Sequence, residues 1–158
     1  MRILGVDPGS VCMGYGVIES EPLSLVGFGV LRAPARSPLE ARLLTLFLKL
    51  EEVFLRYRPA AVAVEEPFVA INPRSALAVG RAQAIALLLT AREGLPVHRY
   101  PPAQVRHQVT GYGGGDKLQV QEMVRMLLGL EAAPQPTDAA DALAVAICHL
   151  LLMRRTGP

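Results

Sequence analysis

A long amphipathic segment that runs straight into a short apolar one constrains this fold most strongly. Between Leu39 and Tyr57 apolar side chains recur every three or four residues, which predicts a helix with one buried face. Pro59 ends that segment, and Ala61 to Glu65 then has the apolar character of a buried strand. A helix that leads directly into a strand implies a crossover onto a parallel neighbour in the same sheet. The chain is therefore expected to be an α/β protein.

The pattern on either side completes this picture. Three apolar runs joined by short Gly- and Pro-containing links predict an antiparallel meander, over 2–7, 13–19 and 25–31. Further helices are expected over 75–93, from Pro102 to about Val109, over 117–128, and from the turn at 134–137 to about Met153, with a strand over 97–100. We predict a five-stranded mixed sheet, three antiparallel strands then parallel strands, flanked by helices in a single domain over residues 1–158.

Composition limits where such a chain works. Cys12 and Cys148 lie far apart without metal-type spacing, which suits free thiols in a reducing compartment. No signal peptide is visible, and the longest charge-free apolar runs fall short of the roughly 20 residues that span a bilayer. We therefore expect a soluble, cytoplasmic protein. Mean hydropathy is +0.33 with 51% apolar residues, which suggests that a partner covers part of the surface.

Four carboxylates stand where apolar elements begin or end: Asp7, Glu65, Asp138 and Asp141. Each has an ordinary explanation by itself. Asp-Pro-Gly is a common turn, a strand can end in a solvated acid, and acids in a first helical turn favour the helix dipole, with Thr137 as a plausible N-cap. Glu66 adjoins Glu65, and alternation means that only one of the two faces a shared site; we choose Glu65 because it continues the apolar strand.

Together the four acids predict a shared cation site. Buried carboxylates are costly unless they are paired or bind metal, and hard divalent cations prefer oxygen ligands. Two strand-end acids plus a helical pair three residues apart match a two-metal site for phosphate chemistry. If these four acids serve metal, 16 basic and 10 acidic residues remain, a balance that suits a polyanion.

Several motifs, in order and spacing, resemble the RuvC family of bacterial Holliday-junction resolvases. They are residues 5–9 (Gly-Val-Asp-Pro-Gly), 64–68 (Val-Glu-Glu-Pro-Phe), the glycine loop that ends at Asp116-Lys117, and residues 138–144 (Asp-Ala-Ala-Asp-Ala-Leu-Ala). The resemblance covers essentially the whole chain. It implies a ribonuclease H-like fold, a homodimer, two Mg²⁺ ions per active site (Mn²⁺ may substitute), and paired nicks across a four-way DNA junction. It also implies a branch-migration partner, the RuvA–RuvB complex.

The resemblance also suggests roles for individual residues. The catalytic and metal-binding acids would be Asp7, Glu65, Asp138 and Asp141. The DNA-contacting residues would be Phe68, Arg74, Arg106 and Lys117, with Phe68 stacking on a junction base and Lys117 near phosphate. Arg106 stands where many relatives have lysine, so the charge is kept but the shape of the cation differs. The small residues of 75–93 would form the dimer interface.

Three other functions fit parts of the pattern. An actin-like phosphotransferase shares the Asp-x-Gly turn, but this chain has no room for the second subdomain that holds a nucleotide, and it lacks a P-loop. A junction-binding dimer without catalysis would have no need of four acids facing DNA phosphates. A related nuclease that acts on another substrate, such as RNA ends, is the third alternative.

Overall fold

Five strands form one mixed sheet, as the sequence predicted. The computed structural model describes residues 1–66 and 72–157. The strands are β1 (Arg2–Asp7), β2 (Cys12–Ser20), β3 (Leu23–Arg32), β4 (Ala61–Glu65) and β5 (Val97–Tyr100), in the spatial order β3-β2-β1-β4-β5. The pairs β3–β2 and β2–β1 are antiparallel, whereas β1–β4 and β4–β5 are parallel. The crossover expected from the helix before β4 is thereby confirmed.

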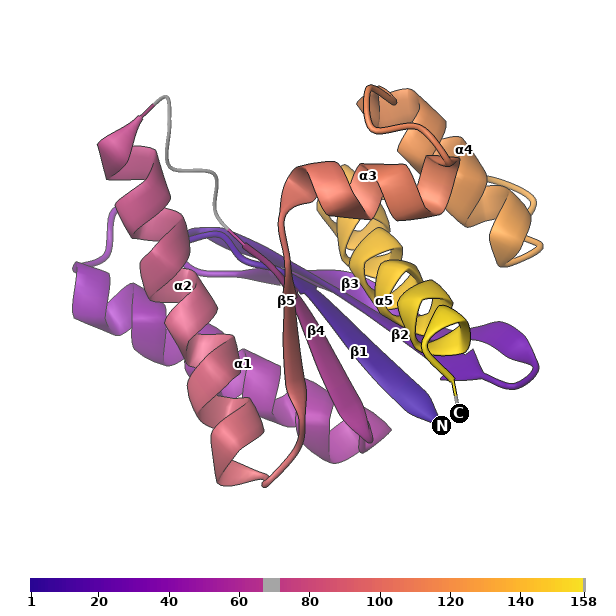
Figure 1. The fold of residues 1–158 in the computed structure, drawn as a ribbon. Coiled ribbons are helices and arrows are strands. Elements are labelled where there is room, and N and C mark those ends of the chain that lie inside the picture. The colour runs from indigo at the N-terminus through magenta and orange to yellow at the C-terminus, as the bar shows by residue number, and fades with distance from the viewer. Residues whose placement is uncertain (67–71, 158) are drawn as a thin grey trace.

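Helices cover both faces of this sheet (Figure 1). They are α1 (Leu39–Tyr57), α2 (Pro73–Arg92), α3 (Pro102–Thr110), α4 (Lys117–Leu127) and α5 (Thr137–Arg155). Helices α1 and α2 share one face; α5 packs across the other, and α3 and α4 pack against α5. The described helices include none long and apolar enough to cross a membrane.

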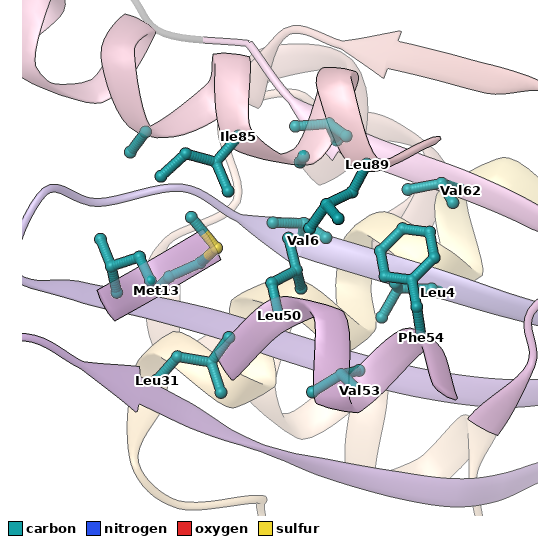
Figure 2. Close-up of a cluster of buried hydrophobic side chains, with 14 of the residues drawn as sticks. Leu4, Val6, Met13, Leu31, Leu50, Val53, Phe54, Val62, Ile85 and Leu89 are labelled. Carbon is teal, nitrogen blue, oxygen red and sulfur yellow. The ribbon is translucent and has the colours of Figure 1, made fainter. Parts of the chain in front are cut away.

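The face under α1 and α2 carries the large apolar side chains (Figure 2). Leu4 and Val6 of β1 and Val62 of β4 project into this layer and are fully buried. Leu50 of α1 and Leu89 of α2 point into the same layer and are equally buried. Each such side chain contributes about 1.5–3 kcal/mol of transfer free energy. This layer therefore supplies an ordinary close-packed core.

The opposite face of the sheet is built from small residues where α5 crosses it. Gly5 of β1 lies opposite Gly16 of β2 in the antiparallel register, and Gly14 lies opposite Asp7. A Cβ at Gly5 would stand 2.0 Å from the carbonyl oxygen of Ala142, and one at Gly14 would stand 2.0 Å from that of Asp138. Because real Cβ atoms do not approach so closely, only glycine allows the α5 backbone to lie this near the strands.

The start of α5 differs from the sequence prediction at its cap. Thr137 is the first residue of the helix rather than its N-cap, so that prediction is wrong. Pro136 holds the cap position in an extended conformation, and no side chain bonds to the free N–H groups of the first turn. A proline fixes the entry angle of the chain but offers no acceptor. The first turn of α5 lies against Gly14, so packing against β2 sets where this helix begins.

Substituting Gly5 by alanine tests this close approach. We expect Gly5→Ala to lower the free energy of unfolding by about 2 kcal/mol or more, because the added methyl meets backbone that cannot move without displacing α5. The matched control is Gly80→Ala in α2, where no atom of the described residues lies within 4 Å of the added carbon. That control should gain about 0.5–1 kcal/mol from helix propensity. Equal urea midpoints for Gly5→Ala and the wild type would contradict the packing argument.

Candidate active site

Two of the four acids end adjacent parallel strands on the same face of the sheet. Gly5 of β1 pairs with Ala63 of β4. Side chains alternate along a strand, so Asp7 lies on the face of Gly5 and Glu65 lies on the face of Ala63. This is the face that α5 covers. The two acids thus lie at the carboxyl ends of neighbouring strands, beneath the first turns of α5.

Helix α5 brings the other two acids to the same place. Asp138 and Asp141 are three residues apart in its first turns and share one helical face. Oxygen atoms of Asp7, Asp138 and Asp141 all lie within 4.8 Å of one another. Glu65 is not one of these three residues, but it lies near them. Its charge raises the pKa of Asp7, and the charge of Asp141 raises the pKa of Glu65. The structure therefore gathers all four predicted acids around one point.

Burial and mutual repulsion oppose ionisation of these acids. Burial, followed by the charges of Glu65, Asp141 and Asp138, raises the pKa of Asp7 to about 8. Burial and the charge of Asp141 raise the pKa of Glu65 to about 7. Burial also raises the pKa of Asp141, although Lys117 opposes that shift. Without a cation the cluster therefore holds protons near neutral pH, as like charges in a partly dry site must.

The arrangement fits a divalent cation. The donors are carboxylate oxygens, which are the ligands that Mg²⁺ and Mn²⁺ prefer. One positive charge is already present, since the Lys117 ammonium lies 2.9 Å from Asp141 Oδ2. That ion pair is partly exposed and leaves Asp7, Glu65 and Asp138 without an equivalent partner among the described salt bridges. A divalent cation would offset the remaining repulsion.

Glu66, the neighbour of Glu65, points elsewhere. Its side chain is 39% exposed and lies 3.8 Å from the guanidinium of Arg99, while its N–H donates to the carbonyl of Tyr100. Glu66 thus completes the pairing of β4 with β5 through its backbone. Of the two adjacent acids, Glu65 is the one on the face of Asp7, in agreement with the choice made from the sequence.

Two clefts flank the acid cluster. The first, of about 380 Å³, is lined by Glu65 and Asp141 of the cluster and by the basic residues Arg106 and Lys117. The second, of about 230 Å³, extends from Asp7 and Glu65 to the first turns of α2 at Ser75 and Val79. The acids therefore adjoin one cleft that also presents two basic side chains and a second that reaches α2, an arrangement that can hold a phosphate with chain continuing on both sides.

The residues expected to contact DNA are placed unequally. Lys117 and Arg106 line the first cleft, and their charges lower the pKa of Glu65. Arg74 lies exposed in the first turn of α2, and no described hydrogen bond or ion pair involves its side chain. Phe68 lies outside the described residues. The structure thus brings two of the four to the acid cluster.

Known proteins match along nearly the whole chain. The family model for "Crossover junction endodeoxyribonuclease RuvC" matches residues 3–149. This chain belongs to the RuvC family. The protein of that name from Dehalococcoides mccartyi is 54% identical over 94% of this chain and 90% of its own length, and that from Chloroflexus aurantiacus is 51% identical over 94% and 92%. The structure "T. thermophilus RuvC in complex with Holliday junction substrate" is 36% identical, covers 98% of this chain and 96% of that one, and superposes with a TM-score of 0.91.

Membership of the RuvC family confirms the predicted fold class. A second structure, "Thermus thermophilus RuvC structure", superposes with a TM-score of 0.90 over 98% of this chain and has the ribonuclease H-like fold. The yeast mitochondrial Holliday junction resolvase Ydc2 shares the fold at 13% identity and a TM-score of 0.67. The acid cluster therefore lies on a scaffold that holds across widely different sequences.

Sequence reasoning missed one neighbour of the cluster. The thiol of Cys12, at the start of β2, lies 3.4 Å from Asp138 Oδ2, and this contact joins β2 to α5 at the site. The signal was present in the alternation of β2, because Cys12, Gly14 and Gly16 share the face on which α5 lies. Reading the stripe of small residues as a helix contact would have placed Cys12 beside the acids.

The raised pKa of Asp7 predicts how stability depends on pH. An unfolded Asp ionises near pH 4, whereas folded Asp7 ionises at about 8. Between those values the unfolded chain binds fewer protons, so the free energy of unfolding falls as pH rises. Asp7→Asn removes this loss. In EDTA at pH 8 we expect the variant to be more stable than the wild type by on the order of 1–3 kcal/mol, with the difference shrinking towards pH 4.

Chemical denaturation at several pH values, with and without Mg²⁺, measures this effect. At pH 8, added Mg²⁺ should reduce the difference in free energy of unfolding between Asp7→Asn and the wild type, because a bound cation relieves the repulsion among the carboxylates of the wild type. Equal stability of the two proteins at pH 8 in EDTA would show that Asp7 carries no such penalty.

Proposed function

We propose that this chain is a structure-selective endonuclease that resolves four-way (Holliday) DNA junctions by paired symmetric nicks, in homologous recombination and DNA repair. The observation that carries the proposal is the acid cluster formed by β1, β4 and α5 in a member of the RuvC family. A relative that superposes over 98% of this chain was solved with a Holliday junction substrate. In this role the protein acts on DNA in the cytoplasm.

The catalytic residues in this proposal are Asp7, Glu65, Asp138 and Asp141, and they would hold two Mg²⁺ ions, for which Mn²⁺ may substitute. Bound there, the ions would activate water for attack on the phosphodiester and stabilise the leaving oxygen. The carboxylates supply the negative charge that makes the site selective for divalent cations. Hydrolysis in this manner leaves a 5′-phosphate and a 3′-hydroxyl, which a ligase can seal.

The basic side chains hold the DNA strand in place. Lys117 and Arg106 line the first cleft together with Glu65 and Asp141, so a phosphate that enters meets positive charge beside the carboxylates. Lys117 is 57% exposed and can bond a phosphate oxygen while it stays near Asp141. Phe68 and Arg74 remain proposed DNA contacts, Phe68 by stacking on a junction base.

A junction-binding protein without catalysis explains the site less well. Burial raises the pKa of Asp7, Glu65 and Asp141, which makes these acids costly to keep ionised in the folded state. Carboxylates facing a DNA phosphate would also weaken its binding unless a cation stood between them. A metal-dependent reaction gives a reason to keep them.

The homodimer and the branch-migration complex, RuvA–RuvB, are the proposed partners. Apolar side chains stand exposed on the outer faces of the helix layer, Leu77 and Leu88 on α2 and Leu44, Leu48 and Leu55 on α1. Large apolar residues in such numbers mark a surface that another chain covers. A two-fold dimer suits a four-way junction, because two equivalent strands need equivalent cuts.

A synthetic four-way junction with labelled strands tests the function. With Mg²⁺ we expect symmetric nicks in two opposing strands of the junction, sealed by ligase, and none in a linear duplex of the same sequence. No nicks are expected in EDTA. Cleavage of the linear duplex at the same rate would remove junction selectivity, and absence of nicking under all conditions with Mg²⁺ or Mn²⁺ would leave no nuclease function.

The adjacent acids Glu65 and Glu66 provide a matched pair of variants. We expect Glu65→Gln to lower the cleavage rate by about 100-fold or more, because loss of a carboxylate weakens cation binding and charge stabilisation together. Glu66→Gln should keep the rate within about threefold, since its side chain lies near Arg99 rather than in the cluster. Junction binding without metal should persist in both variants. Equal losses of cleavage would show that the assignment of Glu65 is wrong.

A further inference from the structure

A hollow beside the acid site has no role in the function proposed so far. It has a volume of about 460 Å³ and lies between the glycine loop that follows α3 and the outer side of α4. Its walls include Tyr112 of the loop and Leu118 and Met123 of α4. Asp116 lines both this hollow and the first cleft of the acid site, so the two spaces adjoin.

The loop that carries Tyr112 is held in one shape by its own hydrogen bonds. The Thr110 hydroxyl accepts from the N–H of Tyr112 at 3.1 Å and lies 2.7 Å from the carbonyl oxygens of both Arg106 and Tyr112. The Gly115 N–H donates to Tyr112 at 3.2 Å, and the Arg106 guanidinium donates to Gly113 at 3.4 Å. The aromatic residue is therefore fixed relative to Arg106, which lines the acid cleft.

The Tyr112 ring is supported from beneath and open to solvent. A Cβ at Gly114 would stand 2.7 Å from atoms of the ring, so the ring rests on the glycine backbone. The residue is nevertheless 67% exposed, and Leu118 beside it is 75% exposed. An aromatic ring and a leucine that stand open to solvent in a preformed shape together offer a surface to a ligand.

The basic charges that suit a nucleic acid strand lie in the adjoining cleft and not in the hollow itself. Its two acids are already engaged: Asp116 Oδ1 accepts from the Gln119 N–H at 2.8 Å as the cap of α4, and Glu122 is paired with Arg125 at 2.6 Å. The adjoining cleft presents Arg106 and Lys117. Lys117 lines the cleft and the next residue, Leu118, lines the hollow, so a strand that crosses from one space to the other passes both.

We propose that Tyr112 stacks on an unpaired nucleobase of the cut strand, next to the scissile phosphate, with Leu118 and Met123 forming the apolar wall of this base site. The inference rests on the proposed junction cleavage and adds a specificity-determining contact to it. Because the site grips a base that has left its pair, it favours branched DNA over intact duplex. Stacking tolerates every base, so the contact selects for strand opening more than for sequence.

Junction binding without metal ions tests the contact directly. In EDTA we expect Tyr112→Ala to weaken binding about tenfold or more, whereas Tyr112→Phe stays within about twofold because the ring is kept. A series of junctions, each with one abasic nucleotide near the crossover, then locates the base. At that position the wild type and Tyr112→Ala should bind equally, since the stacking partner is missing from both.

A fluorescent variant gives a second measurement. The chain contains no tryptophan, so Tyr112→Trp places a single indole in the hollow. We expect its emission to be quenched when the four-way junction binds in EDTA, and the quenching to disappear with the junction that lacks the located base. Linear duplex should quench it far less. This readout does not depend on cleavage or on how well the alanine variant folds.

Several results would overturn the base site. They are unchanged binding by Tyr112→Ala, equal losses in Tyr112→Ala and Tyr112→Phe, and a loss in Tyr112→Ala that no abasic position removes. If no abasic position removes the loss in Tyr112→Ala, or if the junction does not quench the indole, the hollow would instead bind a protein partner. Nicking by the wild type distinguishes failure of the base site from failure of the proposed junction cleavage. If the wild type nicks the junction and these tests fail, only the base site is wrong.

Discussion

The direct contact between α5 and the glycine face of the sheet positions everything else at the site. Two acids belong to strands and two to a helix, so their meeting depends on how near that helix lies. Gly5, Gly14 and Gly16 remove the side chains that would hold α5 away, and the carbonyl oxygens of Ala142 and Asp138 occupy that space. A single methyl group at this contact would separate acids that now lie within 4.8 Å of one another. The site is thus set by backbone approach more than by the acids themselves.

The close approach of the four acids makes their ionisation unfavourable, and the rest of the site offsets this only in part. Burial and mutual repulsion raise the pKa of Asp7 to about 8 and that of Glu65 to about 7, so the folded chain without metal pays for each ionisation. Lys117 relieves Asp141 alone. The large apolar layer beneath α1 and α2 stabilises the same sheet from its other face. Both faces of the sheet carry buried apolar clusters, and their stability lets the strand ends hold a destabilising group of acids.

The sequence predicted the elements well because their signals are local. All five strands and all five helices appear within two residues of the expected ends. The four acids were also found from sequence, since strand ends and a helical spacing of three bring them together. The failures concern contacts between elements. Thr137 fits an N-cap locally, but packing on β2 starts the helix one residue earlier. The Lys117–Asp141 ion pair and the Cys12–Asp138 contact join distant segments, and only the second has a local signal, the stripe of small residues in β2.

Helix α2 links the two faces of the molecule in the proposed homodimer. Its first turns, at Ser75 and Val79, line the cleft that leads to Asp7, while Leu77 and Leu88 stand exposed on its outer side. A partner that covered those leucines would therefore contact the same helix that borders the active site. The position of one acid cluster relative to its two-fold mate would then follow from a single rigid helix. Paired cuts need such a fixed separation, because the two scissile phosphates of a junction are themselves at a fixed distance.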